Sequence, residues 1–433
     1  MKFNHVCIMG LGYIGLPTAC MFASNGIRVT GVDVNEHIVQ TLNQGKIHIQ
    51  EPGLDPLVQA ALLSGLLTVK SYPEPADAFI ITVPTPFYDN KKADMRAVTS
   101  ATEMIGAYLQ VGNVVILEST SPPRTTVDLV QPILERSGLK AGKDFLLAYS
   151  PERVLPGQIL KELAENARVI GGIDIASAEA GRDLYATFVK GEIVLTDATT
   201  AEMIKLMENT YRDINIAIAN EFARIADRFG VNVWEAIGIA NKHPRVKIMN
   251  PGPGVGGHCI SVDPWFLVEA APDLTPLVRT ARQVNDAQPH FVVDLVRRAE
   301  GSLTGKRIAV LGLAFKADVD DLRESPAVEI VRLLNQEGAH TLAYEPYALE
   351  ANLEGVQLAT TLEAALEGAE LILLLVRHRQ FLELTPTIIA QRTTTRRVID
   401  AVNAWSSNEW PEAGFEVHTL GVGSLQPAPA IQQ

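Results

Sequence analysis

The loop formed by residues 252–261, GPGVGGHCIS, places Cys259 behind a run of glycines. A glycine-rich loop can expose backbone N–H groups, and a thiolate beside such donors is stabilised and nucleophilic. Asp263 lies four residues further along the chain. The local sequence leaves two interpretations of Cys259 open, a catalytic nucleophile or a buried structural thiol. We interpret Cys7, in an apolar strand, and Cys20, in an apolar helix, as structural.

A second group of polar residues follows helical spacing between residues 199 and 229. Lys205 and Asn209 are one turn apart, and Arg212 is on the next turn. This spacing fits either a solvated stripe or a lysine and an amide that face a reacting centre. His243 and Arg245, in the basic stretch NKHPRVK, fit either a surface loop or a binding loop.

The segment IMGLGYIGLP carries the spacing Gly10-x-Gly12-x-x-Gly15 directly after an apolar run. Asp33 ends the next apolar run, 21 residues after Gly12. In a dinucleotide site such glycines let the backbone approach a pyrophosphate at a helix N-terminus, and the acidic residue accepts hydrogen bonds from the ribose. The pattern predicts NAD binding. Asp33 favours NAD over NADP, because a carboxylate would repel a 2′-phosphate.

Polar motifs end three later apolar runs, namely TVPTP at 82–86, ESTSP at 118–122 and SPERV at 150–154. In a parallel sheet such motifs lie at the edge where ligands bind. Each motif is also compatible with a plain connecting loop. Glu152 and Arg153 accordingly face either a pocket or solvent.

The order of these elements predicts an α/β fold with two Rossmann-like doubly wound domains joined by a long central helix. The central helix starts with a capping-box pattern at Thr199–Glu202 and continues to about Phe229. The last third of the chain repeats the plan of the first, with a polar insertion, KADVDDLRE, after its glycine turn. We expect domains at residues 1–197, 198–300 and 301–423 and a disordered tail at 424–433.

The composition limits the kind of protein and of partner. The chain has 433 residues, enough for two or three domains, and a formal net charge of −13. An acidic surface disfavours nucleic acid and anionic membranes as partners, although an anionic small substrate needs only a local basic pocket. The three cysteines form no disulfide framework, and no His, Cys or Asp cluster in the sequence has metal-site spacing. No leader segment or bilayer-long apolar run is evident, so we expect a cytoplasmic protein.

The motifs taken together resemble the UDP-glucose/GDP-mannose dehydrogenase family. The likeness covers about residues 3–422 and rests on GLGYIGLP, ESTSPP, SPERVLPG, TAEMIKLMENTYRDINIAIANE, GPGVGGHC and GLAFKADVDDLRESPA, which follow one another in this order. The family oxidises the primary alcohol of a sugar nucleotide to a carboxylate with NAD. The resemblance implies that the helical segment is a dimerisation domain and that the protein is a homodimer or a higher homo-oligomer.

The resemblance also implies catalytic roles. Cys259 would capture the aldehyde as a thiohemiacetal, which a second oxidation turns into a thioester. Lys205 would stabilise oxyanions and transfer protons, and Asn209 would orient the substrate or a water molecule. Asp263 would act as an acid and base or organise water. Thr120 and Glu152 would hold the hydrolytic water.

The binding residues follow from the same motifs. We expect contacts to NAD from Gly10, Gly12, Tyr13, Ile14, Gly15, Asp33, Thr85, Thr120 and Arg323. We expect contacts to the nucleotide sugar from Arg153, Val154, Lys205, Asn209, Arg212, His243, Arg245, Gly256, Phe315 and Lys316. Arg245 would reach the site of a neighbouring subunit. We do not expect His258 to form a dyad with Cys259, because adjacent residues rarely present their side chains to one another.

Departures from the family pattern indicate the acetamido-sugar branch. Pro156 stands where the UDP-glucose branch has a glutamate, and Val262 stands where it has a lysine. Val402 and Asn403 replace a basic residue of relatives, which puts one substrate contact in doubt. We expect UDP-N-acetylmannosamine as the substrate, for surface polysaccharide, with UDP-N-acetylglucosamine or its galactose epimer as the alternative. A two-electron hydroxyacid dehydrogenase and a non-enzymatic NAD-binding module are weaker hypotheses, because neither needs Cys259.

Overall fold

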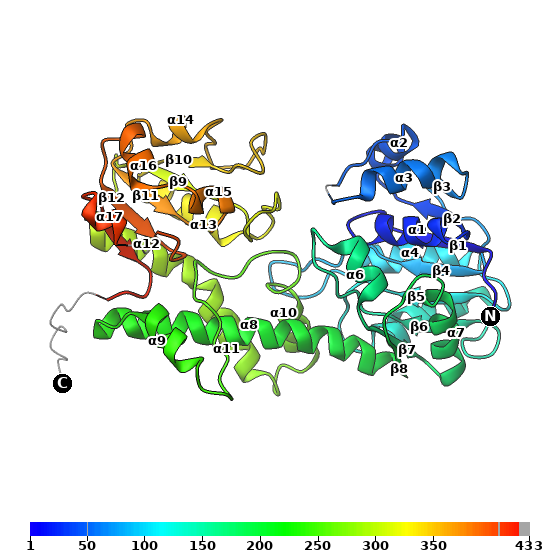
Figure 1. Ribbon diagram of the computed structural model, residues 1–433. Coiled ribbons are helices and arrows are strands. Elements are labelled where there is room, and N and C mark those ends of the chain that lie inside the picture. Colours follow the sequence, from blue (N-terminus) through cyan, green and yellow to red (C-terminus); the bar gives the residue numbers. More distant parts are fainter. Residues whose placement is uncertain (50, 406–407, 424–433) are drawn as a thin grey trace. The chain divides into compact units, whose positions relative to one another are not determined.

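The computed structural model describes residues 1–49, 51–405 and 408–423 (Figure 1). The described chain divides into two compact units. The N-terminal unit comprises Met1–Glu208 and Trp265–Leu274, and the C-terminal unit comprises Asn209–Pro264 and the chain from Thr275 onward. The helical segment expected at 198–300 therefore contributes to both units. The tail expected at 424–433 lies outside the described residues.

The N-terminal unit is built on an eight-stranded sheet with the order β3-β2-β1-β4-β5-β6-β7-β8. The strands are β1 (His5–Met9), β2 (Arg28–Val32), β3 (Leu67–Lys70), β4 (Ala78–Ile81), β5 (Val114–Leu117), β6 (Leu146–Tyr149), β7 (Arg168–Gly172) and β8 (Ile193–Asp197). The expected parallel pairing holds from β3 to β6, and β7 then runs antiparallel to β6. The strand order reverses between β1 and β4, which is where doubly wound sheets bind ligands.

Helices cover both faces of this sheet. They are α1 (Gly15–Ser24), α2 (Glu36–Asn43), α3 (Leu54–Leu63), α4 (Arg96–Gly106), α5 (Gln131–Leu134), α6 (Ile159–Glu165) and α7 (Ile175–Tyr185), with a π-helical turn at Thr126–Val130 and a 3₁₀ turn at Glu135–Ser137. Alternate residues of β1 serve the two faces, with Val6 in one apolar core and Cys7 in the other. Burial raises the pKa of Cys7 and Cys20 to about 12, in agreement with their structural interpretation.

The long helix α8 (Ala198–Phe229) starts two residues earlier than a capping box with Thr199 as its N-cap predicts. Its cap is Asp197, whose carboxylate accepts the N–H of Thr200 at 2.9 Å and its hydroxyl at 2.6 Å. The prediction of Thr199 as the cap was therefore wrong. Glu202 does not reach back to the helix start, because its buried carboxylate accepts the N–H groups of Arg124 and Thr126 instead.

The C-terminal unit contains a five-stranded, fully parallel sheet with the order β10-β9-β11-β12-β13. Its strands are β9 (Arg307–Leu311), β10 (His340–Tyr344), β11 (Leu371–Leu374), β12 (Arg397–Asp400) and β13 (Glu416–Thr419). Its helices are α9 (Val233–Ala240), α11 (Pro276–Asp286), α12 (Gln288–Glu300), α13 (Pro326–Gln336), α14 (Leu362–Leu366), α15 (Arg379–Leu382), α16 (Pro386–Arg392) and α17 (Glu409–Glu412), while α10 (Asp263–Ala270) spans the boundary between the units. This second sheet confirms the predicted pair of Rossmann-like folds.

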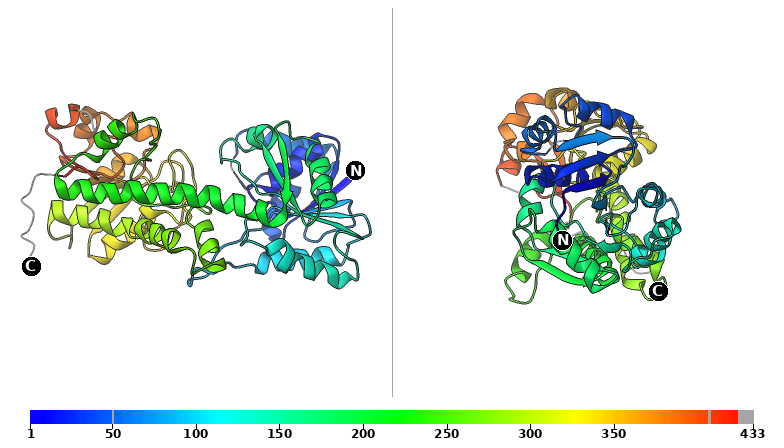
Figure 2. Two further views of the ribbon diagram at one scale, coloured as in Figure 1. Left: turned by 90° about the horizontal axis from the view of Figure 1, so that it is seen from below. Right: turned by 90° about the vertical axis from the view of Figure 1, so that its right-hand side faces the viewer.

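Within the C-terminal unit α8 lies beside α11 and α12 (Figure 2), and side-chain hydrogen bonds join α8 to both helices. The buried guanidinium of Arg282 lies 2.5 Å from Asp213 Oδ1, and Asn285 donates to the same carboxylate at 2.8 Å. A buried carboxylate tolerates its loss of water only when such partners surround it. No helix in the described part of the chain is long and apolar enough to cross a membrane.

Candidate active site

The turn after β1 has the tight geometry that its glycines predict. Gly10 has a φ of +97°, and its N–H donates to Val32 O at 2.7 Å. A Cβ on Gly15 would lie 1.8 Å from Gly10 O, so only glycine fits there. A Cβ on Gly12, in contrast, would meet no atom within 4 Å. Gly12 therefore borders open space, where a pyrophosphate can approach the backbone at the start of α1.

Asp33 lies directly beside this turn. Its two carboxylate oxygens accept the N–H of Leu11 at 3.0 Å and the N–H of Asn35 at 2.9 Å. The side chain is half-buried, and each carboxylate oxygen has a further lone pair for a ribose hydroxyl. The glycine turn and Asp33 thus fit NAD. The expected contacts Tyr13 and Ile14 belong to the same turn, and Ile14 immediately precedes α1.

The loops after β4 and β5 meet this turn at the same edge of the sheet. Thr82 Oγ1 donates to Gly10 O at 2.8 Å, and Ser119 Oγ donates to Val83 O at 2.7 Å. The expected ligand residues Thr85 and Thr120 are half-buried in these two loops. The motifs TVPTP and ESTSP therefore lie together, as the parallel-sheet interpretation requires.

Lys205 is not part of a solvated stripe, since its side chain is only 9% exposed. Its Nζ donates to the backbone carbonyl of Glu152 at 2.7 Å. A lysine held in this way has a fixed direction, which a flexible surface lysine lacks. The structure thus brings two predicted catalytic residues of the N-terminal unit into direct contact.

A buried ion network holds Glu152 in place, and sequence reasoning did not find it. The Arg168 guanidinium is 6% exposed and contacts Glu152 Oε2 at 3.2 Å, Ser150 Oγ at 3.0 Å and the carboxylate of Glu118. Tyr185 donates its hydroxyl to Glu118, and its ring lies 3.8 Å from the guanidinium carbon. Burial raises the pKa of Glu118 to about 7, against the lowering effect of Arg168. An arginine in the otherwise apolar strand RVIGG was the available signal.

The neighbours of Glu152 are also engaged. Arg153 forms an ion pair with Glu208 at 2.8 Å and donates to the carbonyl of Ala167. Val154 packs against one of the two apolar cores of the sheet. The motif SPERV is therefore a fixed segment of the N-terminal unit rather than a solvated loop.

In the C-terminal unit, the glycine-rich loop lies against the segment that follows β9. A Cβ on Gly257 would be 2.7 Å from the ring of Phe315, and one on Gly256 would be 2.4 Å from Glu324 O. The N–H of Gly257 donates to Arg323 O at 3.1 Å. The glycines thus permit a close backbone approach that any side chain would block. Cys259, two residues on, is exposed.

Cys259 is connected to two further predicted catalytic residues of this unit. The N–H of Asp263 donates to the backbone carbonyl of Cys259 at 2.8 Å. Asp263 is 1% exposed, and its carboxylate accepts Asn209 Nδ2 at 2.5 Å. Hydrogen bonds therefore link the backbone of Cys259 to Asp263 and the carboxylate of Asp263 to Asn209, a connection that the sequence spacing of Asn209 did not reveal.

Other predicted ligand residues are exposed on the C-terminal unit, namely Arg212, His243, Arg245, Lys316 and Arg323. Arg323 forms an ion pair with Asp321 at 2.6 Å. Val402 donates its N–H to Asp400, and Asn403 adopts a φ of +51°. Among the described residues, no group of three or more His, Cys, Asp or Glu side chains could hold a metal ion.

Comparisons with known proteins identify the parts of the chain. Three domain models of the UDP-glucose/GDP-mannose dehydrogenase family match it: the NAD binding domain at residues 4–189, the central domain at 199–287 and the UDP binding domain at 309–407. The three matches follow the order of the motifs in the sequence.

Relatives match over nearly their whole length. The chain is 51% identical over 417 residues to an NDP-N-acetyl-D-galactosaminuronic acid dehydrogenase of Ralstonia nicotianae, covering 94% of this chain and 97% of the relative. It is 47% identical over 426 residues to a UDP-N-acetyl-D-mannosamine dehydrogenase of Methanocaldococcus jannaschii, covering 97% of each. The structure of a UDP-D-ManNAc dehydrogenase from Pyrococcus horikoshii superimposes with a TM-score of 0.89 at 40% identity, covering 97% of this chain and 99% of that one. The chain therefore belongs to the UDP-glucose/GDP-mannose dehydrogenase family, as an NAD-dependent dehydrogenase of UDP-sugars.

Proposed function

We propose that this UDP-sugar dehydrogenase oxidises UDP-N-acetyl-D-mannosamine at C6 in two steps, through a thiohemiacetal and a thioester on Cys259. The product is UDP-N-acetyl-D-mannosaminuronate, a building block for surface polysaccharide. The observation that carries the proposal is the packing of Gly256 and Gly257 on Phe315, which holds an exposed thiol beside the UDP-binding segment of the same unit. The relative from Methanocaldococcus jannaschii, named for this substrate, supports the choice of sugar.

The first oxidation removes a hydride from C6 and a proton from its hydroxyl, leaving an aldehyde. When bound, NAD accepts the hydride in each of the two oxidations. We assign Lys205 to the oxygen at C6, where its ammonium stabilises the negative charge that develops. The contact of Lys205 Nζ with Glu152 O would fix the direction of the amine, so that no reorganisation is needed during the reaction.

The thiolate of Cys259 then adds to the aldehyde carbon, and the carbonyl oxygen takes up a proton to give the thiohemiacetal. The second oxidation removes a hydride from C6 and the hydroxyl proton, leaving a thioester. Water adds to the thioester carbon, the C–S bond breaks, and the thiol is regenerated. One sugar, two NAD⁺ and one water therefore give the uronate, two NADH and three protons.

The water for hydrolysis is assigned to Thr120 and Glu152, with Asp263 as its organiser or as an acid and base. The hydrogen bond from Asn209 to Asp263 supports this role, because it fixes the direction of the buried carboxylate. The nucleotide sugar is assigned to the segment around Phe315 and to further residues that the family motifs indicate, which are Arg153, Val154, Arg212, His243, Arg245, Gly256 and Lys316. NAD is assigned to the turn of Gly10–Gly15, to Asp33, Thr85 and Thr120, and to Arg323.

Counting NADH formed per sugar tests the proposal. The full-length enzyme is given NAD with one UDP-N-acetylhexosamine at a time, and NADH is followed by its absorbance. Two NADH per molecule of the mannosamine compound, with a larger kcat/KM than for its epimers, supports the proposal. One NADH per sugar would reject the thioester route.

The galactosamine epimer is the second candidate substrate. The 51% identity to the Ralstonia dehydrogenase, which is named for N-acetyl-D-galactosaminuronic acid, favours it. The same assay decides between the two substrates. A larger kcat/KM for the galactosamine compound, with two NADH per sugar, would support the thioester route but identify galactosamine as the sugar.

A homodimer through α8 is part of the proposal. Within the C-terminal unit, Tyr211, Ile218 and Ile225 are exposed at seven-residue intervals, and Phe222 and Phe229 are exposed four residues after the last two. This spacing is the seam of paired helices, so a second copy of the same helix would cover it. Sedimentation of Phe222→Glu tests the seam, because a charge at its centre should leave monomers. An unchanged oligomeric state in this variant would remove α8 from the interface.

A further inference from the structure

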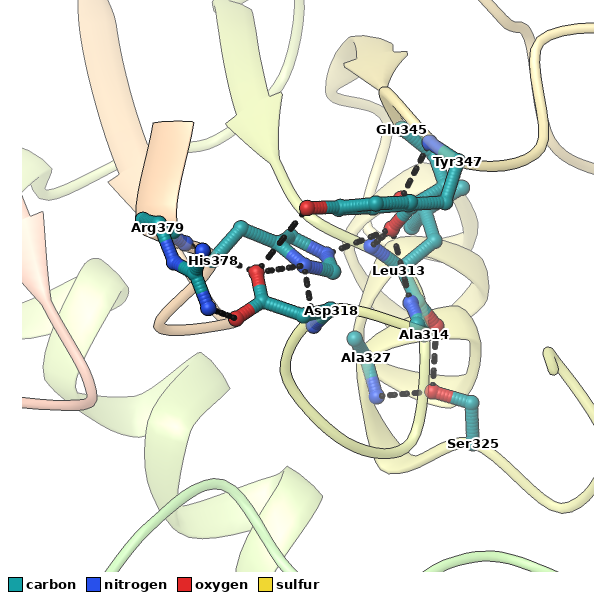
Figure 3. A network of polar contacts seen from close by, with 9 residues as sticks. All are labelled: Leu313, Ala314, Asp318, Ser325, Ala327, Glu345, Tyr347, His378 and Arg379. Atoms are coloured by element: carbon teal, nitrogen blue, oxygen red, sulfur yellow. Dashed lines mark hydrogen bonds and ion pairs between the residues drawn. The ribbon is translucent and has the colours of Figure 1, made fainter. Parts of the chain in front are cut away.

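Glu345, directly after β10, is fully buried and lies against the segment that follows β9 (Figure 3). Its carboxylate accepts the N–H groups of Leu313 at 2.7 Å, Ala314 at 2.9 Å and Tyr347 at 3.0 Å. A buried carboxylate with three backbone donors fixes the path of the chain that supplies them. Glu345 thus holds the first two residues of the segment Leu313–Asp318.

His378 holds the other end of this segment. Its Nδ1 lies 2.9 Å from the backbone N of Asp318, and its Nε2 lies 3.0 Å from Glu345 Oε2. Because a backbone N–H can only donate, Nδ1 is the acceptor, and the neutral ring carries its hydrogen on Nε2. His378 therefore donates to Glu345 and accepts from Asp318, which links the two ends through one buried ring.

Asp318 needs this support, because its φ of +61° is unfavourable for a residue with a Cβ. Its carboxylate Oδ1 accepts the hydroxyl of Tyr347 at 3.0 Å and the N–H of Arg379 at 2.9 Å. The Tyr347 ring also lies 5.0 Å from the His378 ring. Figure 3 shows the side chains of Asp318, Tyr347 and His378 close together.

The held segment carries Phe315 and Lys316. Phe315 donates its N–H to Asp321 O at 3.1 Å, and its ring lies against Gly257 of the glycine-rich loop 252–261. We infer that His378 is a positioning residue for the nucleotide part of the UDP-sugar: together with Glu345 it fixes Leu313–Asp318 so that Phe315 and Lys316 meet the ligand. The inference rests on the proposed function, which assigns these two residues to UDP.

Two substitutions separate the two hydrogen bonds of the ring. In His378→Asn, the amide oxygen takes the place of Nδ1 and keeps an acceptor for Asp318. In His378→Gln, the amide nitrogen takes the place of Nε2 and keeps a donor for Glu345. Each variant loses one buried hydrogen bond, so both should show a similar fall in melting temperature. His340→Gln is the matched control, because His340 is exposed on β10 of the same sheet.

Binding of UDP to the full-length enzyme, measured by calorimetry, is the readout. We expect His378→Gln to raise the Kd for UDP about tenfold and His378→Asn to raise it about threefold or less, because only the first variant releases Asp318. KM for the UDP-sugar should follow the same order while KM for NAD stays constant. An unchanged Kd in both variants overturns the inference. So does a Kd that rises in proportion to the loss of melting temperature, because that pattern indicates a structural role alone.

The number of NADH formed per sugar tests the proposed function independently of the role of His378. If His378→Gln binds UDP as the wild type does and the wild type gives two NADH per sugar, the inference fails and the proposed function stands. If the wild type does not bind UDP, both fail.

Discussion

Asp33 and Glu345 follow the second strands of two similar sheets, β2 in the N-terminal unit and β10 in the C-terminal unit. Each accepts the N–H of the leucine after the glycine that ends the first strand, at 3.0 Å for Leu11 and 2.7 Å for Leu313. Each also accepts the N–H two residues further along its own chain, at 2.9 Å for Asp33 and 3.0 Å for Glu345. The two turns are therefore local copies of one arrangement.

The two carboxylates differ in what they leave for a ligand. Asp33 is half-buried, and the neighbouring Gly12 borders open space. Glu345 is fully buried, with His378 at 3.0 Å from its Oε2. The turn beside Asp33 thus has polar groups that can bind a dinucleotide, whereas at the turn beside Glu345 the corresponding groups hydrogen-bond within the protein and fix the loop. A shared turn therefore does not imply a shared way of binding a ligand, because a single side chain such as His378 can occupy the hydrogen-bonding groups that a ligand would use.

The largest expected effect separates chemistry from binding in the C-terminal unit. Cys259→Ser should lower kcat for four-electron oxidation by about 10³-fold or more, because a serine hydroxyl ionises far less readily than a thiol and is therefore a much weaker nucleophile. The Kd values for UDP and NAD should stay within about threefold. Stopped-flow measurement of NADH and calorimetry with both nucleotides check this. Cys20→Ala, in the buried α1, is the control and should lower stability but not kcat.

Arg168→Met should have the largest effect on stability in the N-terminal unit. It leaves Glu118 and Glu152 without their buried cation, which costs about 3 kcal/mol of unfolding free energy. Arg182→Met is the matched control, because Arg182 pairs with Asp183 at the surface and should matter by less than about 1 kcal/mol. Chemical unfolding followed by circular dichroism gives both values. Equal losses in the two variants would contradict the role of the network.

Two glycine substitutions test the contrast between open and closed turns. Gly12→Ala places its Cβ in open space, so it should leave the melting temperature unchanged yet weaken NAD binding about 100-fold by blocking the pyrophosphate. Gly257→Ala drives its Cβ into Phe315, so it should lower the melting temperature and weaken the binding of UDP rather than that of NAD. Calorimetry with NAD and with UDP measures both affinities. An unchanged affinity for NAD in Gly12→Ala would show that the cofactor does not bind at this turn.

Local patterns in the sequence predicted much of this arrangement. The glycine turn with Asp33 is visible because its members lie within one βαβ unit, and the Lys205–Asn209 spacing is visible because a helix repeats every turn. The strand β3, with the short sequence LTVK, has no clear local signal, because it alternates buried and exposed residues over only four positions. The antiparallel direction of β7 was missed because apolar runs carry no direction.

Contacts between distant residues were out of reach. Arg168 meets Glu118 across 50 positions, and His378 meets Glu345 across 33. A single sequence shows that an arginine or histidine is present but not which carboxylate the fold brings to it. The prediction of the N-cap of α8 was wrong for another reason. Asp197 and Thr199 are both favourable N-cap residues, and only the position at which β8 ends decides between them.

Reciprocal substitutions of the two carboxylates sharpen the comparison itself. Asp33→Asn should raise KM for NAD about tenfold and reduce the ratio of kcat/KM for NAD to that for NADP. It should leave the binding of UDP unchanged. Glu345→Gln should weaken UDP binding and leave KM for NAD unchanged, because its effect passes through the segment of Phe315. Initial rates with NAD and NADP, together with UDP calorimetry, test the pair. If both variants affect the same nucleotide, the division of roles between the two turns is wrong.

The smallest expected effect is a difference in pH dependence between two buried carboxylates, Glu345 and Glu118. Burial works to raise the pKa of Glu345, but the hydrogen bonds from His378 and from backbone N–H groups lower it overall. At Glu118 burial prevails over Arg168 and raises the pKa to about 7. Folding therefore lowers the proton affinity of Glu345 and raises that of Glu118.

The signs of the two pH effects follow by linkage. A lowered pKa gives stability that is present above the pKa of the unfolded chain, about 4.3, and is lost as pH falls through the folded pKa. Glu118 stays protonated in the fold while it ionises in the unfolded chain, so its contribution falls as pH rises from about 4.5 to about 7. The advantage of wild type over Glu345→Gln should thus shrink in acid. Its advantage over Glu118→Gln should shrink towards neutrality. For a single proton, each slope is at most about 1.4 kcal/mol per pH unit. Calorimetric unfolding of the three proteins between about pH 3 and pH 8 measures both slopes, and slopes of the same sign would contradict the contrast between the two units.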